Sequence, residues 1–204
     1  MSKMFYMDES NGFSAKLKVI GVGGGGCNAL NNMVDACVQG VEFIAANTDI
    51  KSLSMCKAPT KIQMGSKLTR GLGAGANPEI GRQAALEDIE KITEHLKGSD
   101  MVFITCGLGG GTGTGASTVI AEISKDLGAL TVAIATKPFT FEGKDRMMQA
   151  ENGVAQLKTR VDSLITIPNQ RLLSIGGKHM TIMEAFLKAD EVLLNAVRSI
   201  SDLI

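Results

Sequence analysis

The sequence lacks the segments that direct a protein into or across a membrane. No stretch approaches the ~18 consecutive apolar residues of a membrane span. The N-terminal MSKMFYMDESNG has neither the apolar run nor the small-residue cleavage site of a signal peptide. We therefore expect a cytoplasmic protein with reduced thiols and no direct membrane insertion.

Clusters of charge and of metal ligands are absent as well. The 21 basic and 21 acidic residues cancel, and no run of about five or six like charges suggests a nucleic-acid-binding tail. The cysteines, Cys27, Cys37, Cys56 and Cys106, are too far apart for a CxxC pair, and the two histidines are distant from each other. We expect no nucleic-acid partner and no protein-held metal.

The chain does contain a regular alternation of short apolar segments with helical patterns. With 204 residues and 44% hydrophobic composition it is long enough for one compact domain. We predict strands at 17–22, 41–46, 60–64, 101–106, 130–135 and 164–167, and helices at 28–39, 78–97, 146–160 and 181–204. This order predicts an α/β fold, a Rossmann-like parallel sheet with helices on both faces that ends in a long helix.

The two ends of the chain suggest a division into three parts. Residues 1–14 are polar and unpatterned, which favours a flexible N-terminal segment. Thr181 and Glu184 have the spacing of a capping box, so a helix is expected to begin there. Because residues 181–204 are apolar on more than one side, we expect a central helix against which a second domain, absent here, packs. Residues 15–180 would form the binding domain.

Two glycine-rich loops each follow a predicted strand and open a helix, an arrangement that aims backbone N–H groups at an anion. The first, GVGGGGCN at 21–28, fits GxGxxG, and Asp49 lies where a dinucleotide fold keeps its ribose acid. A plain glycine turn is the alternative. The second, GLGGGTGTG at 107–115, is so rich in glycine that we expect a loop, with Thr112 and Thr114 adding hydroxyl donors.

A third glycine stretch, RGLGAGANP at 70–78, also precedes a helix. None of the three loops ends in the GK[ST] of a P-loop, so the backbone must do most of the phosphate binding. Three loops that can bind anions suit a triphosphate better than one dinucleotide pyrophosphate.

Several longer motifs occur in a specific order. The GGGTGTG segment, together with GVGGGGCNA, ANTD, LTRGLGAGANPE, PFTFEG, IPNQRL, EAFLKAD and SISDLI, resembles the tubulin and FtsZ superfamily on its bacterial branch, from about residue 16 to 204. The resemblance implies a cell-division GTPase that assembles head to tail into the filaments of the septal ring. It also implies bound GTP or GDP, with Mg²⁺ accompanying GTP, and other cell-division proteins recruited through a tail absent here.

The resemblance also assigns roles to individual positions. Those expected to bind the α and β phosphates are Gly24, Gly25, Gly26, Cys27, Asn28, Gly107, Gly110, Gly111, Thr112, Gly113 and Thr114. Ala74, Gly75 and Asn77 would lie by the γ phosphate, and Glu142 and Arg146 by the ribose and phosphates. Asn169 and Asp190 would read guanine, and Phe186 would stack on the base.

No catalytic residue is expected on this chain, because the family completes its site with an acidic loop from the next subunit, just after the central helix. We therefore expect GTP binding with little hydrolysis, and capping of full-length filaments. Cys27 departs from the family's usual glycine or asparagine. At a helix N-terminus its thiol is expected to have a lowered pKa and to be alkylated, whereas the other cysteines are expected to be core thiols.

Other interpretations remain open at this point. An NAD-dependent oxidoreductase fits the GxGxxG loop but leaves residues 107–115 without a role. A nucleotide-free interaction protein with a degenerate site fits poorly, because every phosphate-loop motif is intact. Without the resemblance, Arg146 is a solvated helix residue, Asp190 a surface charge and Phe186 a core side chain.

Overall fold

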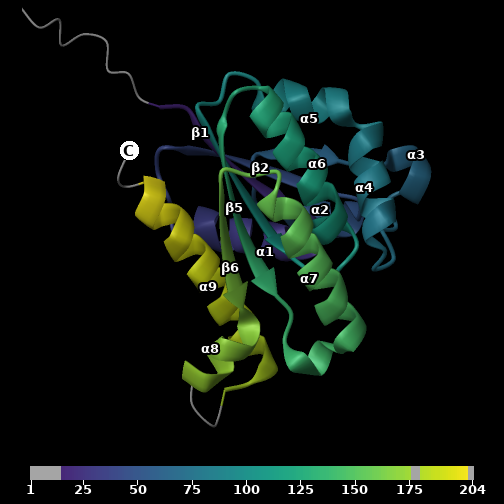
Figure 1. The fold of residues 1–204 in the computed structure, drawn as a ribbon. Helices are drawn as coiled ribbons and strands as arrows, with labels where there is room; N and C mark the ends of the chain where they lie inside the picture. The colour runs from purple at the N-terminus through teal and green to yellow at the C-terminus, as the bar shows by residue number, and fades with distance from the viewer. Residues whose placement is uncertain (1–14, 176–179, 202–204) are drawn as a thin grey trace, which may run out of the picture.

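The computed structural model describes residues 15–175 and 180–201. Its centre is a sheet of six parallel strands in the order β3-β2-β1-β4-β5-β6 (Figure 1). The strands are β1 (Leu17–Val22), β2 (Val41–Asn47), β3 (Thr60–Gln63), β4 (Met101–Gly107), β5 (Leu130–Lys137) and β6 (Ser163–Pro168). All six predicted strands are present, and the predicted parallel α/β fold is confirmed.

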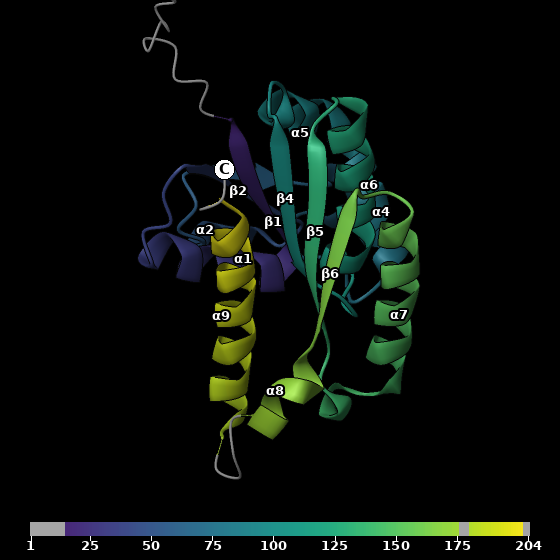
Figure 2. The same cartoon turned by 60° about the vertical axis from the view of Figure 1, so that its left-hand side comes forward.

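Helices cover both faces of the sheet, as Figure 2 shows. One face packs against α4 (Pro78–Glu87), α5 (Ile89–Leu96), α6 (Thr112–Asp126) and α7 (Lys144–Lys158). The other packs against α1 (Gly23–Asp35), α2 (Ile50–Met55), α8 (Asn169–Ile175) and α9 (Ile182–Ser201). Short helices α3 (Ser66–Thr69) and η1 (Thr140–Glu142) lie in connections. The sheet is therefore buried on both sides, which explains its nearly continuous apolar strands.

Both glycine loops are shorter than predicted, because helix begins inside them. Helix α1 starts at Gly23 rather than residue 28 and ends at Asp35 rather than 39, and α6 starts at Thr112. A Cβ on Gly26 would lie 2.5 Å from the Thr105 carbonyl oxygen, and one on Gly113 would lie 2.4 Å from that of Gly107. At these two glycines, the backbone of the helix packs directly on the backbone of β4.

The predicted helix 78–97 is two helices, α4 and α5, separated at Asp88. The Asp88 side chain is buried, and its carboxylate accepts hydrogen bonds from the Gly65 amide at 2.7 Å and from the Lys91 ammonium. A buried carboxylate needs such partners, so the turn at Asp88 is held by tertiary contacts that periodicity does not reveal. The predicted position of Pro78 in the first turn of α4 is confirmed.

The C-terminal helix begins with the predicted capping box. The Thr181 amide donates to the Glu184 carboxylate at 2.7 Å, and the Glu184 amide donates to the Thr181 hydroxyl at 3.2 Å. Helix α9 buries Ala185, Ala189, Leu193, Leu194 and Val197, whereas Ile182, Met183 and Leu187 are exposed. It is thus apolar on more than one side, as predicted.

Parts of the predicted division lie outside the described residues: the N-terminal segment 1–14, residues 176–179 and the end of the central helix at 202–204. Within the described ranges, no helix is both long enough and apolar enough to cross a membrane.

We expect Gly115→Ala to destabilise the fold strongly, because the new Cβ would lie 1.8 Å from the Pro78 carbonyl oxygen and would push α6 away from α4. The expected loss is about 3 kcal/mol of unfolding free energy, measured by urea denaturation. Gly24→Ala is the matched control, since a Cβ there meets nothing within 4 Å. Equal stability of the two variants would contradict the proposed backbone contact.

Candidate functional site

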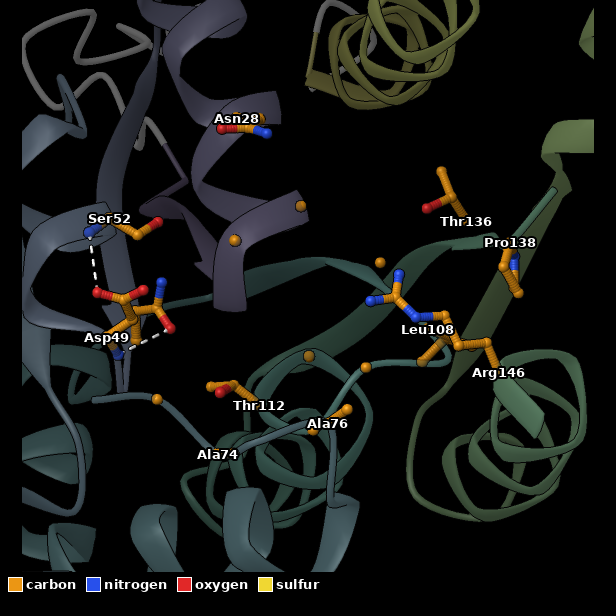
Figure 3. Close-up of a pocket in the computed structure, with 18 of the residues that line it drawn as sticks. Asn28, Asp49, Ser52, Ala74, Ala76, Leu108, Thr112, Thr136, Pro138 and Arg146 are labelled. Atoms are coloured by element: carbon orange, nitrogen blue, oxygen red, sulfur yellow. Dashed lines mark hydrogen bonds between the residues drawn. The ribbon is translucent and has the colours of Figure 1, made fainter. Parts of the chain in front are cut away.

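A cavity of about 570 Å³ opens at the carboxyl ends of the strands (Figure 3). It lies where the strand order reverses, between β1 and β4, which is the usual place for a ligand in an open parallel sheet. The lining residues that the sequence predicted are Gly24, Gly25, Asn28, Ala74, Gly75, Gly107, Gly110, Gly111, Thr112, Gly113, Glu142, Arg146, Asn169, Phe186 and Asp190. Segments far apart in the chain thus meet around one space.

The first part of the cavity is formed by the N-terminal turns of α1 and α6. Gly24 and Gly25 belong to the first of these turns, and Thr112 and Gly113 to the second. The first N–H groups of a helix have no intrahelical partner, and the helix dipole is positive there. Neither turn carries an acidic residue. Two such ends at one cavity favour an anion with several oxygens.

The third glycine stretch forms a wall of the cavity beside these turns. Ala76 and the glycines on either side of Ala74 have positive φ, so this loop follows a path that favours glycine. A Cβ on Gly111 would lie 2.8 Å from the Ala74 Cβ and 2.9 Å from the Asn77 amide nitrogen. The loop therefore rests directly on the second glycine loop, and a side chain at position 111 would separate them.

An ion pair between η1 and α7 lines the cavity. Arg146 donates to the Glu142 carboxylate at 2.8 Å, and the other oxygen of Glu142 accepts from the Phe139 amide at 2.8 Å. The Arg146 side chain extends from α7 into the cavity (Figure 3). Because Glu142 is itself fixed by the backbone, the ion pair orients the guanidinium toward the glycine loops.

The far part of the cavity combines two acceptors with an aromatic ring. Asn169, at the start of α8, is 4% exposed, and its Oδ1 has no hydrogen-bond partner among the described residues. Burial raises the pKa of the Asp190 carboxyl from its usual 3.8 to about 7. Phe186 lies one helical turn before Asp190 and packs edge-on against Phe139, with ring centroids 5.1 Å apart. An unpaired buried acceptor and a desolvated carboxyl both favour a ligand with N–H donors.

Four predicted residues do not line the cavity. Gly26 packs against β4, and the Asn77 side chain caps α4 by accepting from the Glu79 amide at 3.0 Å. Thr114 is buried, and its hydroxyl accepts from the Gly109 amide at 2.9 Å, so it shapes the second loop from behind. Cys27 is 1% exposed and faces the protein interior.

Two predictions about the cysteines are wrong. A hydrogen bond with Cys56 and burial raise the pKa of the Cys27 thiol, instead of lowering it. Cys27 is the fifth residue of α1 rather than its N-terminus, so it lies too deep for the reactivity expected of it. Cys37 is exposed and therefore not a core thiol, whereas Cys56 and Cys106 are buried.

Other lining residues were missed or were given another role. They are Asn47, Asp49, Ser52, Leu72, Gly73, Ala76, Leu108, Thr136, Pro138 and Ala189. Several lie at or just after the carboxyl ends of β2 and β5. Because ligands in parallel sheets bind at this edge, the positions that follow each predicted strand could have been listed as candidates. Asp49 was considered only as a ribose ligand, yet its carboxylate caps α2 by accepting from the amides of Lys51 and Ser52.

The described residues contain no group of three or more histidine, cysteine, aspartate or glutamate side chains placed to hold a metal ion.

Comparison with known proteins gives consistent matches. A family profile described as the tubulin/FtsZ family, GTPase domain, matches residues 16–177. The chain is 59% identical to the cell division protein FtsZ of Azotobacter vinelandii and 58% identical to that of Pseudomonas aeruginosa, over 98% of this chain and 51% of each relative. It thus spans about half the length of these relatives. An FtsZ dimer of M. jannaschii, described as empty, superposes with a TM-score of 0.90 at 52% identity, covering 93% of this chain and 55% of that one.

The raised pKa of Asp190 predicts how stability depends on pH. Between about pH 4 and 7 the unfolded chain loses this proton and the folded chain keeps it, so stability falls as pH rises through that window. The Asp190→Asn variant has no carboxyl group at this position to ionise, so its stability does not fall in this window for that reason. The full shift corresponds to about 4 kcal/mol, and solvent screening of this partly exposed carboxyl reduces it. We therefore expect the variant to be about 2 kcal/mol more stable than the parent at pH 8, and equally stable at pH 4, in urea titrations. A constant difference at both pH values would contradict a desolvated carboxyl.

Proposed function

Because the chain belongs to the tubulin/FtsZ family, we propose that it binds GTP and GDP as the nucleotide-binding domain of a cell-division GTPase. The observation that carries the proposal is the asymmetry of the cavity. One end presents two helix N-termini without acidic residues, and the other presents buried acceptors beside an aromatic ring. A nucleotide has the matching asymmetry, with an anionic end and a planar base.

The phosphates would occupy the end formed by the glycine loops. Free N–H groups from the first turns of α1 and α6 supply donors, and the absence of side chains at Gly24, Gly25 and Gly110 leaves the backbone accessible. Arg146 adds a cation that Glu142 orients. The loop at Ala74 and Gly75 lies against Gly111, which suits contact with a third phosphate.

Guanine would occupy the other end. Its N1–H and 2-amino groups are donors, and a carboxylate at Asp190 accepts from both. The Asn169 amide offers a second acceptor through Oδ1 and a donor for O6 through Nδ2. Adenine has no N1–H and no 2-amino group, so it would leave the Asp190 carboxylate buried without a donor. Phe186, which is 40% exposed, offers a ring face for stacking.

Hydrolysis needs a group that orients the attacking water, and the acidic residues of the cavity are engaged elsewhere. Asp49 caps α2, Glu142 holds Arg146 and the Phe139 amide, and Asp190 lies at the base end. We therefore propose that turnover depends on residues outside the described ranges, supplied by a neighbouring copy in a head-to-tail filament. Mg²⁺ would be bound mainly by the phosphates and water, with GTP.

The face of the chain that carries the proposed nucleotide site can dock on the complementary face of a longer relative. We accordingly propose that it acts as a cap on filaments of a full-length relative, and that the intact protein forms homo-oligomers in the septal ring. The solved FtsZ dimer of M. jannaschii supports association between copies of a related chain. We also propose that the intact protein recruits other cell-division proteins.

The first experiment is calorimetry with GDP, GTP, ATP and NAD. We expect guanine nucleotides to bind and ATP and NAD to bind at least about 100-fold more weakly, because the acceptors at Asp190 and Asn169 would then lack donors. GDP affinity is expected to fall about tenfold from pH 8 to pH 6, since protonation of Asp190 competes with the base. Tighter binding of NAD than of GDP would overturn the proposal.

The Asp190→Asn variant tests the base assignment. We expect GDP affinity to fall about 100-fold and xanthosine diphosphate to bind better than GDP, because the amide nitrogen can donate to the carbonyl that xanthine has at C2. Glu191→Gln is the matched control: this neighbouring side chain is 52% exposed, pairs with Lys188 and does not line the cavity. The control should keep parental affinity and guanine preference.

Turnover and capping are tested together with the same chain. We expect phosphate release from GTP to be at least about 100-fold slower than from a polymerising full-length relative. We also expect excess chain to reduce the amount of that relative sedimented as polymer. Turnover by the chain alone at the rate of the full-length relative would contradict the proposed dependence on a neighbouring copy. Unchanged sedimentation at excess chain would contradict the proposed capping.

A further inference from the structure

Two buried thiols meet directly behind the glycine turn of α1. Cys27 is 1% exposed and Cys56 is 3% exposed. The Cys56 sulfur lies 3.7 Å from the Cys27 carbonyl oxygen, and the two thiols interact closely enough for each to shift the pKa of the other. Cys27 also accepts from the Asn47 amide at 3.9 Å, and Asn47 lines the cavity. The proposed nucleotide binding uses neither sulfur.

The two members of the pair are not equivalent. The hydrogen bond from Cys27, with a further contribution from the charge of Lys61, lowers the pKa of Cys56 to about 6. The same hydrogen bond and burial raise the pKa of Cys27. Of the two thiols, Cys56 therefore ionises more readily and is the better nucleophile, whereas Cys27 keeps its proton.

The segment around Cys56 has few buried side chains. Cys56 follows the last residue of α2, a six-residue helix whose one buried side chain is Leu53. Its neighbours in sequence, Met55 and Lys57, are exposed. A segment with so few buried contacts opens locally at little cost, which admits a small oxidant without global unfolding.

We propose that Cys27 and Cys56 form a peroxide-reactive thiol pair that closes to an intramolecular disulfide. The Cys56 thiolate attacks one oxygen of hydrogen peroxide, the O–O bond breaks, and the departing hydroxide takes up a proton to leave as water. The Cys27 sulfur then attacks the resulting sulfenic acid. The S–S bond forms, the S–O bond breaks, and the hydroxide leaves as water with the Cys27 proton. Two thiols and one peroxide give one disulfide and two waters.

The other cysteines serve as internal comparisons. Burial raises the pKa of the Cys106 thiol to about 12, so it is expected to be inert. Cys37 is exposed, so it is expected to give intermolecular products. The bond would tie the turn of α1 that lines the cavity to the end of α2, across 29 positions of the chain.

The experiment uses the complete chain with Cys37→Ser, treated with one equivalent of hydrogen peroxide in the absence of nucleotide. We expect two of the three remaining thiols to disappear, the mass to fall by two hydrogen atoms, and peptide mapping to join Cys27 to Cys56. Dithiothreitol should restore both thiols. Retention of all three thiols, or a disulfide that includes Cys106, would overturn the proposal.

The order of the two steps is tested by single variants in the same background. With Cys27→Ser, we expect a sulfenic acid at Cys56 that dimedone traps, whereas with Cys56→Ser we expect Cys27 to stay unmodified over the same time. Should either variant fail to fold by circular dichroism, dimedone added during oxidation of the Cys37→Ser chain gives the same readout, with label expected at Cys56. Label found first at Cys27 would contradict the assigned roles. None of these readouts depends on nucleotide binding.

Discussion

Direct contact between glycine backbones is the constraint on which the cavity depends. Helix α1 packs on β4 through Gly26, α6 packs on β4 through Gly113, and α4 packs on α6 through Gly115. A side chain at any of these positions would meet a carbonyl oxygen at 2.5 Å or less. Because the helices are drawn so close, the N-terminal turns of α1 and α6 face one space and leave their amides to a ligand.

The sequence was sufficient to predict the six strands, because alternating apolar segments are a strong signal for a parallel sheet. It did not predict the short helices α2, α3 and α8. The motifs in the sequence also identified most of the residues that line the cavity. The sequence did not predict where α1 and α6 begin, since glycine is read as a loop former and its value as a close contact appears only with the partner strand present. The break at Asp88 was missed for the same reason: its partner, the Gly65 amide, lies 23 residues away.

Burial explains the other differences between sequence and structure. Cys27 was judged from its distance to a helix start, yet its pKa is set by Cys56, a neighbour that no local pattern reveals. Asp190 was singled out by the resemblance, but its raised pKa follows only from the environment that desolvates it. The two ends of the cavity therefore differ in kind, one built from backbone groups and the other from buried side chains.

The cavity is assembled from parts that are made at different times. Gly24 is made first, Gly113 and Arg146 follow, and Asn169 and Asp190 come last of these residues. At about 5–20 residues per second, roughly 10–30 s separate the synthesis of Gly24 from that of Asp190. A sheet that has formed by then would already present the end of the cavity proposed to hold the phosphates, before the residues proposed to bind the base have been made. The proposed selectivity for the base would thus be added after the glycine loops are made, when α9 packs against the sheet.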